Sequence, residues 1–326
     1  MYRSFIRRFI LTLTLLIRIA FYTLIERKFL GYSQIRKGPN KPRLSGLPIP
    51  LADAVKLFTK EQINPTIANS TPFYIAPTIA LLIAILLGNL IPSPQSIIIL
   101  SISAPLFSAI ARLNVYTSLT AGWSRNSKYA IMGTVRAIAQ TISYEVGISL
   151  CMLLCLVIFI SLNLSDNFYL MSWPILLCPF IAPIWLAIIL AETNRTPYDL
   201  VEGESELVSG FNIEYRGGPF AIIFIAEYTS IIVISLFSAT LFLPSFTSLF
   251  FLIKTLFIAI FFLWARATIP RIRYDNLIYL IWLSFLPFIL GIWIIYLIAF
   301  ILLESSLIKI YTLEVYDRRK PLSNPM

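Results

Sequence analysis

The chain has 326 residues, of which 58% are hydrophobic and only 13% are charged. This composition lies outside the range of water-soluble globular proteins and excludes a soluble fold. The net charge of +10 is carried on short linkers between apolar stretches, so it indicates membrane topology and not a nucleic-acid partner. Histidine is absent and the three cysteines show no CxxC spacing. The sequence therefore argues against zinc, haem or iron–sulfur ligation.

Long apolar stretches, divided by Pro, Gly, Asn and charged residues, predict membrane-spanning helices. A helix needs about 20 apolar residues to cross a hydrocarbon core of about 30 Å, and these runs are too continuously apolar for a membrane β-barrel. The expected spans are 5–25, 72–91, 97–117, 137–160, 174–191, 220–243, 248–266 and 277–302. We therefore expect an all-α fold, a polytopic bundle of about eight transmembrane helices.

The spans divide the chain into a single transmembrane domain, residues 1–303, and a C-terminal tail, residues 304–326, in which no motif is visible. An even number of spans puts both termini on one side of the membrane. Most basic residues lie on the linkers of the other side, which are 27–61, 112–136, 192–219 and 266–273. The positive-inside rule then assigns that side to the cytoplasm or mitochondrial matrix. The first span begins almost at Met1 without a transit segment, so we expect it to be retained.

The first basic linker, residues 26–40, carries Arg27 and Arg36, which can simply hold the first helix in place by meeting lipid phosphates. Apolar residues then recur at the spacing i, i+3, i+4 and i+7, at Leu51, Ala54, Val55 and Phe58. This pattern predicts a short amphipathic helix in the membrane interface, with Asp53 among its polar residues. Such a helix is either a structural brace or a wall at the entrance for an amphiphile.

Two carboxylates, Glu145 and Glu227, fall inside predicted spans, at a cost of about 3 kcal/mol each. Each lies nine residues after the start of its span, marked by Arg136 and Gly218. At about 1.5 Å per residue both reach about 13 Å deep, close to the bilayer midplane. Their matched depth indicates successive stations on one proton path, unless each is merely paired with a neighbouring hydroxyl or backbone group.

The linker between the fifth and sixth predicted spans is acidic on the side where topology favours basic residues. Six carboxylates share it with Arg195 and Arg216. The six are Glu192, Asp199, Glu202, Glu204, Glu206 and Glu214. They are either a solvated acidic loop or a partly buried group. Buried together, they cannot all stay ionised, so some would have raised pKa values and titrate as a coupled set, as a proton relay requires.

A basic turn, residues 264–275, joins the last two spans and contains Arg266, Arg271 and Arg273. The turn is either a topology anchor or a site for an anionic or polar headgroup.

Five stretches together resemble the subunit 1 family of mitochondrial NADH dehydrogenase, the quinone-channel membrane subunit of respiratory complex I. They are ERKFLGYSQIRKGPNK (26–41), ADAVKLFTKE (52–61), GWSRNSKYAIMGTVRAIAQTISYEV (122–146), AETNRTPYDLVEGESELVSGFNIEYRGGPFAIIFIAEYTS (191–230) and WARATIPRIRYD (264–275). They are spread through nearly the whole chain, in the expected order and between the expected spans. Each is moderately specific, and the set is very specific.

The resemblance implies a core membrane subunit of the mitochondrial inner membrane, with long polar loops on the matrix side and both termini in the intermembrane space. It implies ubiquinone as substrate, with NADH, FMN and iron–sulfur clusters in partner subunits. Its partners would be the peripheral-arm quinone-site subunits and the antiporter-like membrane subunits. In this family the residues around the channel correspond to Arg27, Arg36, Asp53, Phe58 and Arg266. The charged proton route corresponds to Glu145, Glu192, Asp199, Glu202, Glu204, Glu206, Glu214 and Glu227.

Two other functions compete with an enzyme subunit. A free-standing proton or cation transporter would also use Glu145 and Glu227, but an inverted repeat with paired broken helices is not evident in the sequence. A membrane scaffold that only assembles other subunits would leave the two costly midplane acids unexplained.

Overall fold

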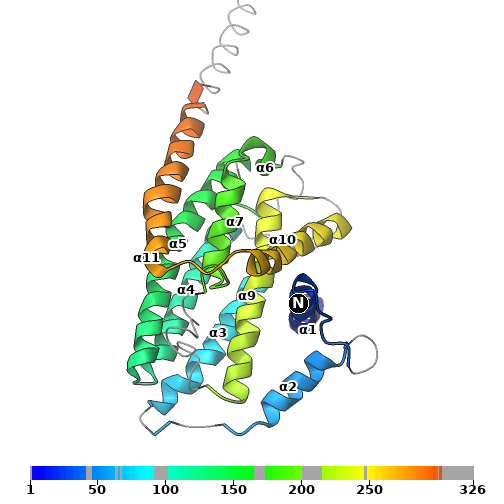
Figure 1. Cartoon of the computed structure of the whole chain (residues 1–326). Helices are drawn as coiled ribbons and strands as arrows, with labels where there is room; N and C mark the ends of the chain where they lie inside the picture. The colour runs from blue at the N-terminus through cyan, green and yellow to red at the C-terminus, as the bar shows by residue number, and fades with distance from the viewer. Residues whose placement is uncertain are drawn as a thin grey trace, which may run out of the picture.

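The computed structural model describes residues 2–41, 46–62, 65–66, 68–91, 102–159, 161–164, 173–199, 215–245, 248–299 and 301–302. These residues form helices and short connections, without a strand among them (Figure 1). Six of the described helical segments are long and apolar enough to cross a membrane, and Ile181–Glu192 is a shorter apolar helix. The predicted fold class, an all-α polytopic membrane bundle, is confirmed.

The helices are α1 (Tyr2–Ser33), α2 (Ile49–Thr59), α3 (Ser70–Leu90), α4 (Ser103–Trp123), α5 (Lys128–Phe159), α6 (Pro174–Leu177), α7 (Ile181–Glu192), α9 (Gly218–Phe242), α10 (Ser248–Thr268) and α11 (Tyr274–Tyr279). A π-helical turn, η3 (Leu280–Phe285), continues α11, and the apolar segment runs on to Ala299. The division into a domain at 1–303 and a tail at 304–326 stays a prediction, because the tail lies outside the described residues.

Helix α9 is the centre of the bundle. It packs against α3 and α10 and also contacts α1 and α2. Buried residues occur on all sides of its second half, from Ile231 to Phe242. Since only a helix surrounded by others hides its whole circumference, this part of α9 is enclosed. Helices α4, α5 and α7 extend the bundle beyond α3. Helix α3 packs against α4, α4 against α5 and α5 against α7.

Several predicted spans differ from the helices observed: α1 continues to Ser33, α5 begins at Lys128, one span is divided and another ends later. The predicted span 174–191 is divided into α6 and α7 at Cys178, whose backbone is not helical (φ −129°, ψ 67°). Pro179 explains the division, because proline lacks the amide donor and disfavours helical geometry in the residue before it. Helix α4 continues to Trp123, so residues 118–123, which lie beyond the predicted span 97–117, are helical.

Helix α2 is the predicted amphipathic helix. Leu51, Val55 and Phe58 are all more than half exposed and form its apolar face. The end of α2 lies close to the start of α9 at Gly217, which has a positive φ of 68°. A Cβ there would lie 2.7 Å from the Lys60 carbonyl oxygen. Only glycine fits both constraints, so this position fixes the end of α2 beside α9.

Candidate functional site

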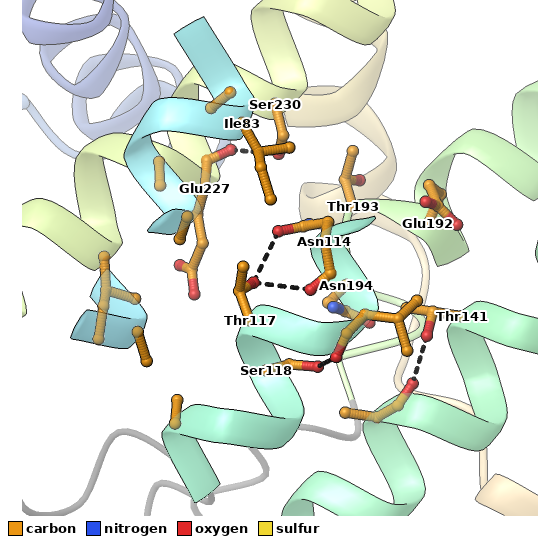
Figure 2. A pocket seen from close by; sticks show the side chains of 18 of the residues that line it. Ile83, Asn114, Thr117, Ser118, Thr141, Glu192, Thr193, Asn194, Glu227 and Ser230 are labelled. Atoms are coloured by element: carbon orange, nitrogen blue, oxygen red, sulfur yellow. Dashed lines mark hydrogen bonds between the residues drawn. The ribbon is translucent and has the colours of Figure 1, made fainter. Parts of the chain in front are cut away.

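The first candidate site is a cavity of about 100 Å³ between α3, α4, α7 and α9, enough for several water molecules. Two of the predicted relay carboxylates, Glu192 and Glu227, line it. Figure 2 shows them on opposite sides, with Asn114 and Thr117 between them. Thr117 is held in place by hydrogen bonds that it donates to the side-chain oxygen of Asn114, at 3.0 Å, and to its backbone oxygen, at 2.6 Å.

A second, smaller cavity of about 60 Å³ lies beside the first and contains Glu145, the third predicted relay residue. Glu145 forms an ion pair with Arg112 of α4, with 3.3 Å between Nε and Oε1. The carboxyl group of Glu192 also lines this cavity.

The two cavities meet at four residues that line both of them, namely Leu87, Asn114, Glu192 and Ser230. Three of the four are polar, which is the chemistry that retains water in an otherwise apolar bundle. Oε2 of Glu192 is buried without a hydrogen-bond partner among the described protein atoms. A buried carboxylate oxygen normally has a partner, so this oxygen has an unused capacity to accept a hydrogen bond. The arrangement forms a polar line from Glu227 through Glu192 to Glu145.

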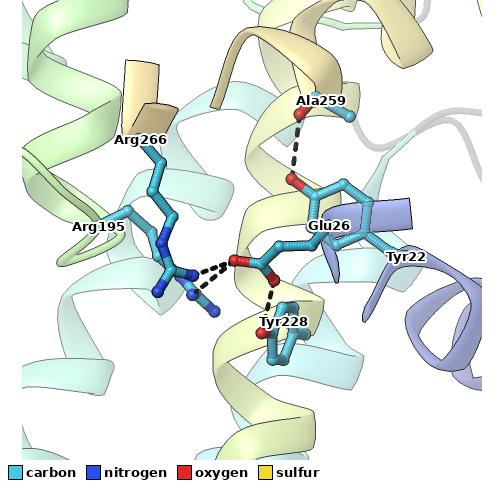
Figure 3. Close-up of polar contacts among 6 residues, drawn as sticks. All are labelled: Tyr22, Glu26, Arg195, Tyr228, Ala259 and Arg266. Carbon is cyan, nitrogen blue, oxygen red and sulfur yellow. Dashed lines mark hydrogen bonds and ion pairs between the residues drawn. The ribbon is translucent and has the colours of Figure 1, made fainter. Parts of the chain in front are cut away.

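A second candidate site is a buried ionic cluster around Glu26, near the end of the apolar part of α1 (Figure 3). Arg266 donates a hydrogen bond to Oε1 of Glu26, and Arg195 lies 3.5 Å from the same oxygen. Tyr228 of α9 donates a hydrogen bond of 2.6 Å to Oε2 of Glu26. The cluster therefore joins α1, α9, α10 and the turn after α7 through one carboxylate.

Arg195 connects the cluster with the first cavity. Its guanidinium lies over the ring of Tyr228, 4.4 Å from the ring centroid, and its side chain lines the cavity with Glu192 and Glu227. Burial by itself would lower the pKa of Arg195, but Tyr228, Glu26 and Glu227 raise it more, so the net shift is upward. Arg195 thus stays charged and is electrostatically linked to carboxylates on both sides.

The predicted channel residues fall into two places. Arg27 and Asp53 form an ion pair of 2.8 Å that joins the end of α1 to α2, and both side chains are about half exposed. Phe58 lies farther along α2 and is exposed. Arg36 is also exposed, and its Nε donates to Gln34. Arg266 is separate from these residues, in the Glu26 cluster.

The acidic loop lies mostly outside the described residues, so the predicted positions Glu202, Glu204, Glu206 and Glu214 remain predictions. Asp199, the last described residue before it, is partly buried. The residue that follows the loop, Tyr215, packs against Arg125, whose guanidinium carbon lies 4.1 Å from the ring centroid. Arg125 is only 1% exposed.

The sequence interpretation missed the roles of Glu26 and Arg195. Glu26 was counted as the start of a polar linker, but α1 continues through it to Ser33. The sequence feature that indicates Glu26 is part of α1 is helical spacing: Tyr22 and Glu26 are four residues apart and therefore lie on one helix face. Arg195 was visible only as one of two basic residues in an acidic segment. Among the described residues, no group of three or more His, Cys, Asp or Glu side chains is placed to hold a metal ion.

The helices and the buried carboxylates define a multi-pass membrane protein with ionisable groups inside its bundle. A family model described as NADH dehydrogenase matches residues 6–297. The chain is 47% identical over 281 residues to NADH-ubiquinone oxidoreductase chain 1 of Anopheles gambiae, covering 85% of this chain and 90% of that protein. It is 48% identical over 295 residues to the protein of the same name from Lampetra fluviatilis, again covering 85% and 90%. The chain belongs to the NADH dehydrogenase family, and the family predicted from the five motifs is confirmed.

Proposed function

We propose that this chain is a core membrane subunit of a proton-translocating NADH:ubiquinone oxidoreductase in the mitochondrial inner membrane. In this role it forms much of the ubiquinone channel and carries the carboxylates that couple quinone reduction to proton movement. Relatives of nearly the same length, from insects and vertebrates, carry the name of this enzyme's chain 1. NADH, flavin and the iron–sulfur clusters would lie in partner subunits, which deliver the electrons.

The observation that carries the relay is the junction of the two cavities at Glu192. A proton that moves between Glu227 and Glu145 needs hydrogen-bonded groups along the whole distance, since protons cross apolar protein only through such chains. Glu192, Asn114 and Ser230 line both cavities and supply these groups. Ionisable residues inside a membrane bundle are costly and are functional candidates for that reason.

The Glu26 cluster supports a coupling step. Quinone reduction takes up two electrons and two protons, so it changes the charge and hydrogen bonding of its surroundings. Arg195 touches the Glu26 cluster and interacts electrostatically with Glu227. A change of charge beside the cluster would therefore alter the proton affinity of Glu227 across a single side chain. No side chain of this chain need act as a nucleophile or hydride donor.

The channel assignment rests on the surface formed by α1, α2 and α9. Phe220, Phe224 and Tyr228 follow one another along one face of α9, with ring centroids 4.5 Å and 6.4 Å apart. The last ring of this row contacts Arg195 and Glu26, so a row of aromatic side chains ends at charged hydrogen-bonding groups. A quinone has this polarity, with an apolar tail and a polar head. Arg27, Arg36, Asp53 and Phe58 would lie at the entry, and Arg266 farther in.

The topology completes the proposal. The long polar loops, including the acidic loop with Asp199, Glu202, Glu204, Glu206 and Glu214, would lie on the matrix side. Both termini would lie in the intermembrane space, as the distribution of basic residues indicates.

The test substitutes glutamine at Glu145, Glu192 and Glu227 in turn and measures assembly, quinone reduction and proton pumping in the same membranes. Each variant should assemble and lose most of its pumping. Asp275→Asn is the matched control. The exposed carboxylate of Asp275 forms an ion pair of 3.2 Å with Arg273, and this pair lies away from both cavities. Full pumping by all three glutamine variants would remove the relay. Proton movement by the isolated chain in liposomes would instead favour the free-standing transporter.

A further inference from the structure

Three side chains from distant parts of the chain form a buried stack beside the start of α9. The guanidinium carbon of Arg125, in the turn between α4 and α5, lies 4.1 Å from the ring centroid of Tyr215. The ring of Tyr215 stacks on the ring of Phe73 in α3, with 4.3 Å between the centroids and 14° between the planes. Two groups at these distances cannot share one face of a ring, so Arg125 and Phe73 lie on opposite faces of Tyr215. All three side chains are buried.

Hydrogen bonds tie this stack to the backbone of the neighbouring segments. The hydroxyl of Tyr215 donates to the backbone oxygen of Phe73 at 3.1 Å. The amide of Asn69, the residue before α3, donates to the backbone oxygen of Ser124 at 2.8 Å. Ser124 is the residue before Arg125, so the start of α3 and the turn after α4 are joined at the stack. The ring of Tyr215 is therefore held on both faces by its neighbours and at its edge by a hydrogen bond.

The stack also contacts the aromatic row of α9, which begins at Phe220 and ends at Tyr228. Tyr215 lies three residues before Gly218, the first residue of α9. Phe220 packs against the buried cluster that contains Tyr215 and Phe73. A shift of Tyr215 would therefore reach the first ring of the row in two ways, through direct packing and through a few residues of backbone.

We propose that Arg125 is a positioning residue for quinone binding. By holding Tyr215 against Phe73 it fixes the start of α9 and the aromatic row, which the proposed function assigns to the quinone path, so the inference rests on that function. An apolar side chain could fill the same space without the free-energy cost of burying a charge. A guanidinium, however, is planar, lies flat on an aromatic ring and is attracted to its face, whereas an aliphatic chain is not. The buried charge thus serves to orient the ring and not only to fill volume.

The test compares Arg125→Met with Arg125→Lys in the intact complex. Methionine keeps an unbranched side chain but removes the charge and the planar group, whereas lysine keeps a cation that can lie over the ring. Amide hydrogen exchange in residues 215–224 should become about tenfold faster in Arg125→Met, an effect of the size expected when a buried cation–π contact is lost. The KM for quinone should rise about threefold while kcat stays unchanged, because the row contributes to binding and not to the reduction itself. Arg125→Lys should restore most of both quantities.

Arg216→Met is the matched control, because it makes the same substitution beside Tyr215 at a position where the side chain is exposed. This variant should keep the exchange rate and the KM of the unsubstituted complex. Arg125→Gln, which retains a planar polar group without the charge, is the second variant if methionine prevents assembly. It should give the same two changes as methionine.

The two measurements separate failure of this inference from failure of the channel assignment. Unchanged hydrogen exchange in Arg125→Met or Arg125→Gln would overturn the positioning role and leave the channel assignment standing. Faster exchange with an unchanged KM would mean that Arg125 holds the start of α9 but that the aromatic row does not bind quinone. That result would overturn the channel assignment and, with it, the role of Arg125 in quinone binding.

Discussion

The Glu26 cluster and the cavity carboxylates place the same chemical group in opposite surroundings. Glu26 is 5% exposed. Its carboxylate pairs with two arginines and accepts a hydrogen bond from a tyrosine hydroxyl. Glu192 also lines a cavity, but its buried Oε2 has no hydrogen-bond partner among the described protein atoms. A carboxylate whose oxygens are both held by donors has its hydrogen bonding satisfied, whereas one with an unpartnered oxygen can accept a further hydrogen bond. The bundle thus separates a fully partnered carboxylate from one with an unpartnered oxygen, and Arg195 contacts the first and lines the cavity of the second.

Removing the charge of Glu26 should have the largest effect on the stability of the complex. Glu26→Gln leaves Arg195 and Arg266 without their shared counter-ion, which should cost about 3–5 kcal/mol of stability. Thermal inactivation of the complex should shift to lower temperature, and less intact complex should be recovered. Blue native electrophoresis and an activity-loss curve measure the two effects.

A second substitution checks the cause. Glu26→Gln combined with Arg266→Met removes one of the two uncompensated cations and should recover part of the lost stability. No recovery would mean that Glu26 contributes through packing and not through its charge.

The hydrogen bond from Tyr228 is the next contribution in size. Tyr228→Phe removes the donor to Glu26 but keeps the ring beneath the Arg195 guanidinium. The expected loss is about 2 kcal/mol, the usual value for a hydrogen bond to a charged group. Tyr228→Leu, which removes both the hydroxyl and the ring, should be less stable still. Equal stability of Phe and Leu variants would exclude a contribution from the cation–π contact.

The junction of the cavities is probed at Asn114, a neutral side chain that lines both cavities. Asn114→Leu would replace a hydrogen-bonding group by an apolar one between the two cavities that contain Glu227 and Glu145. Proton translocation should fall by about tenfold, equivalent to about 1.4 kcal/mol in the barrier. Protons moved per NADH oxidised measure the effect.

Asn114→Ser is the control for that substitution, because it keeps a polar side chain between the cavities and should retain most of the activity. If the leucine variant pumps as well as the serine variant, the proton path does not pass Asn114.

The sequence was informative where burial has a simple local signal. Matched spacing from the span starts predicted that Glu145 and Glu227 belong together, and the structure places both beside Glu192. The depth argument relied on a span start at Arg136, although α5 begins at Lys128. The all-α membrane fold followed from composition. In lipid the backbone N–H and C=O groups must bond to one another, and a helix satisfies them within one segment.

The Glu26 cluster could not be predicted in this way, because its partners lie 169, 202 and 240 residues away along the chain. Long-range pairing depends on how the helices cross, and α1 is seen nearly end-on in the view where α5 and α9 run lengthwise (Figure 1). The spacing of residues within α1 does not predict the angle at which α1 crosses the other helices. Arg112 was likewise assigned to a linker, since a basic residue near a span end ordinarily marks topology.

The smallest effect is expected at the exposed counterpart of the Glu26 cluster. Asp53→Asn breaks the ion pair with Arg27. The distance of 2.8 Å is that of a strong pair, but both side chains are about half exposed. Solvent screening reduces such a pair to about 0–1 kcal/mol, so the thermal inactivation midpoint should barely move. A loss as large as that of Glu26→Gln would mean that the pair is covered in the assembled enzyme. An unchanged midpoint together with a higher KM for quinone would instead place Asp53 at the channel entry, acting on the substrate and not on the fold.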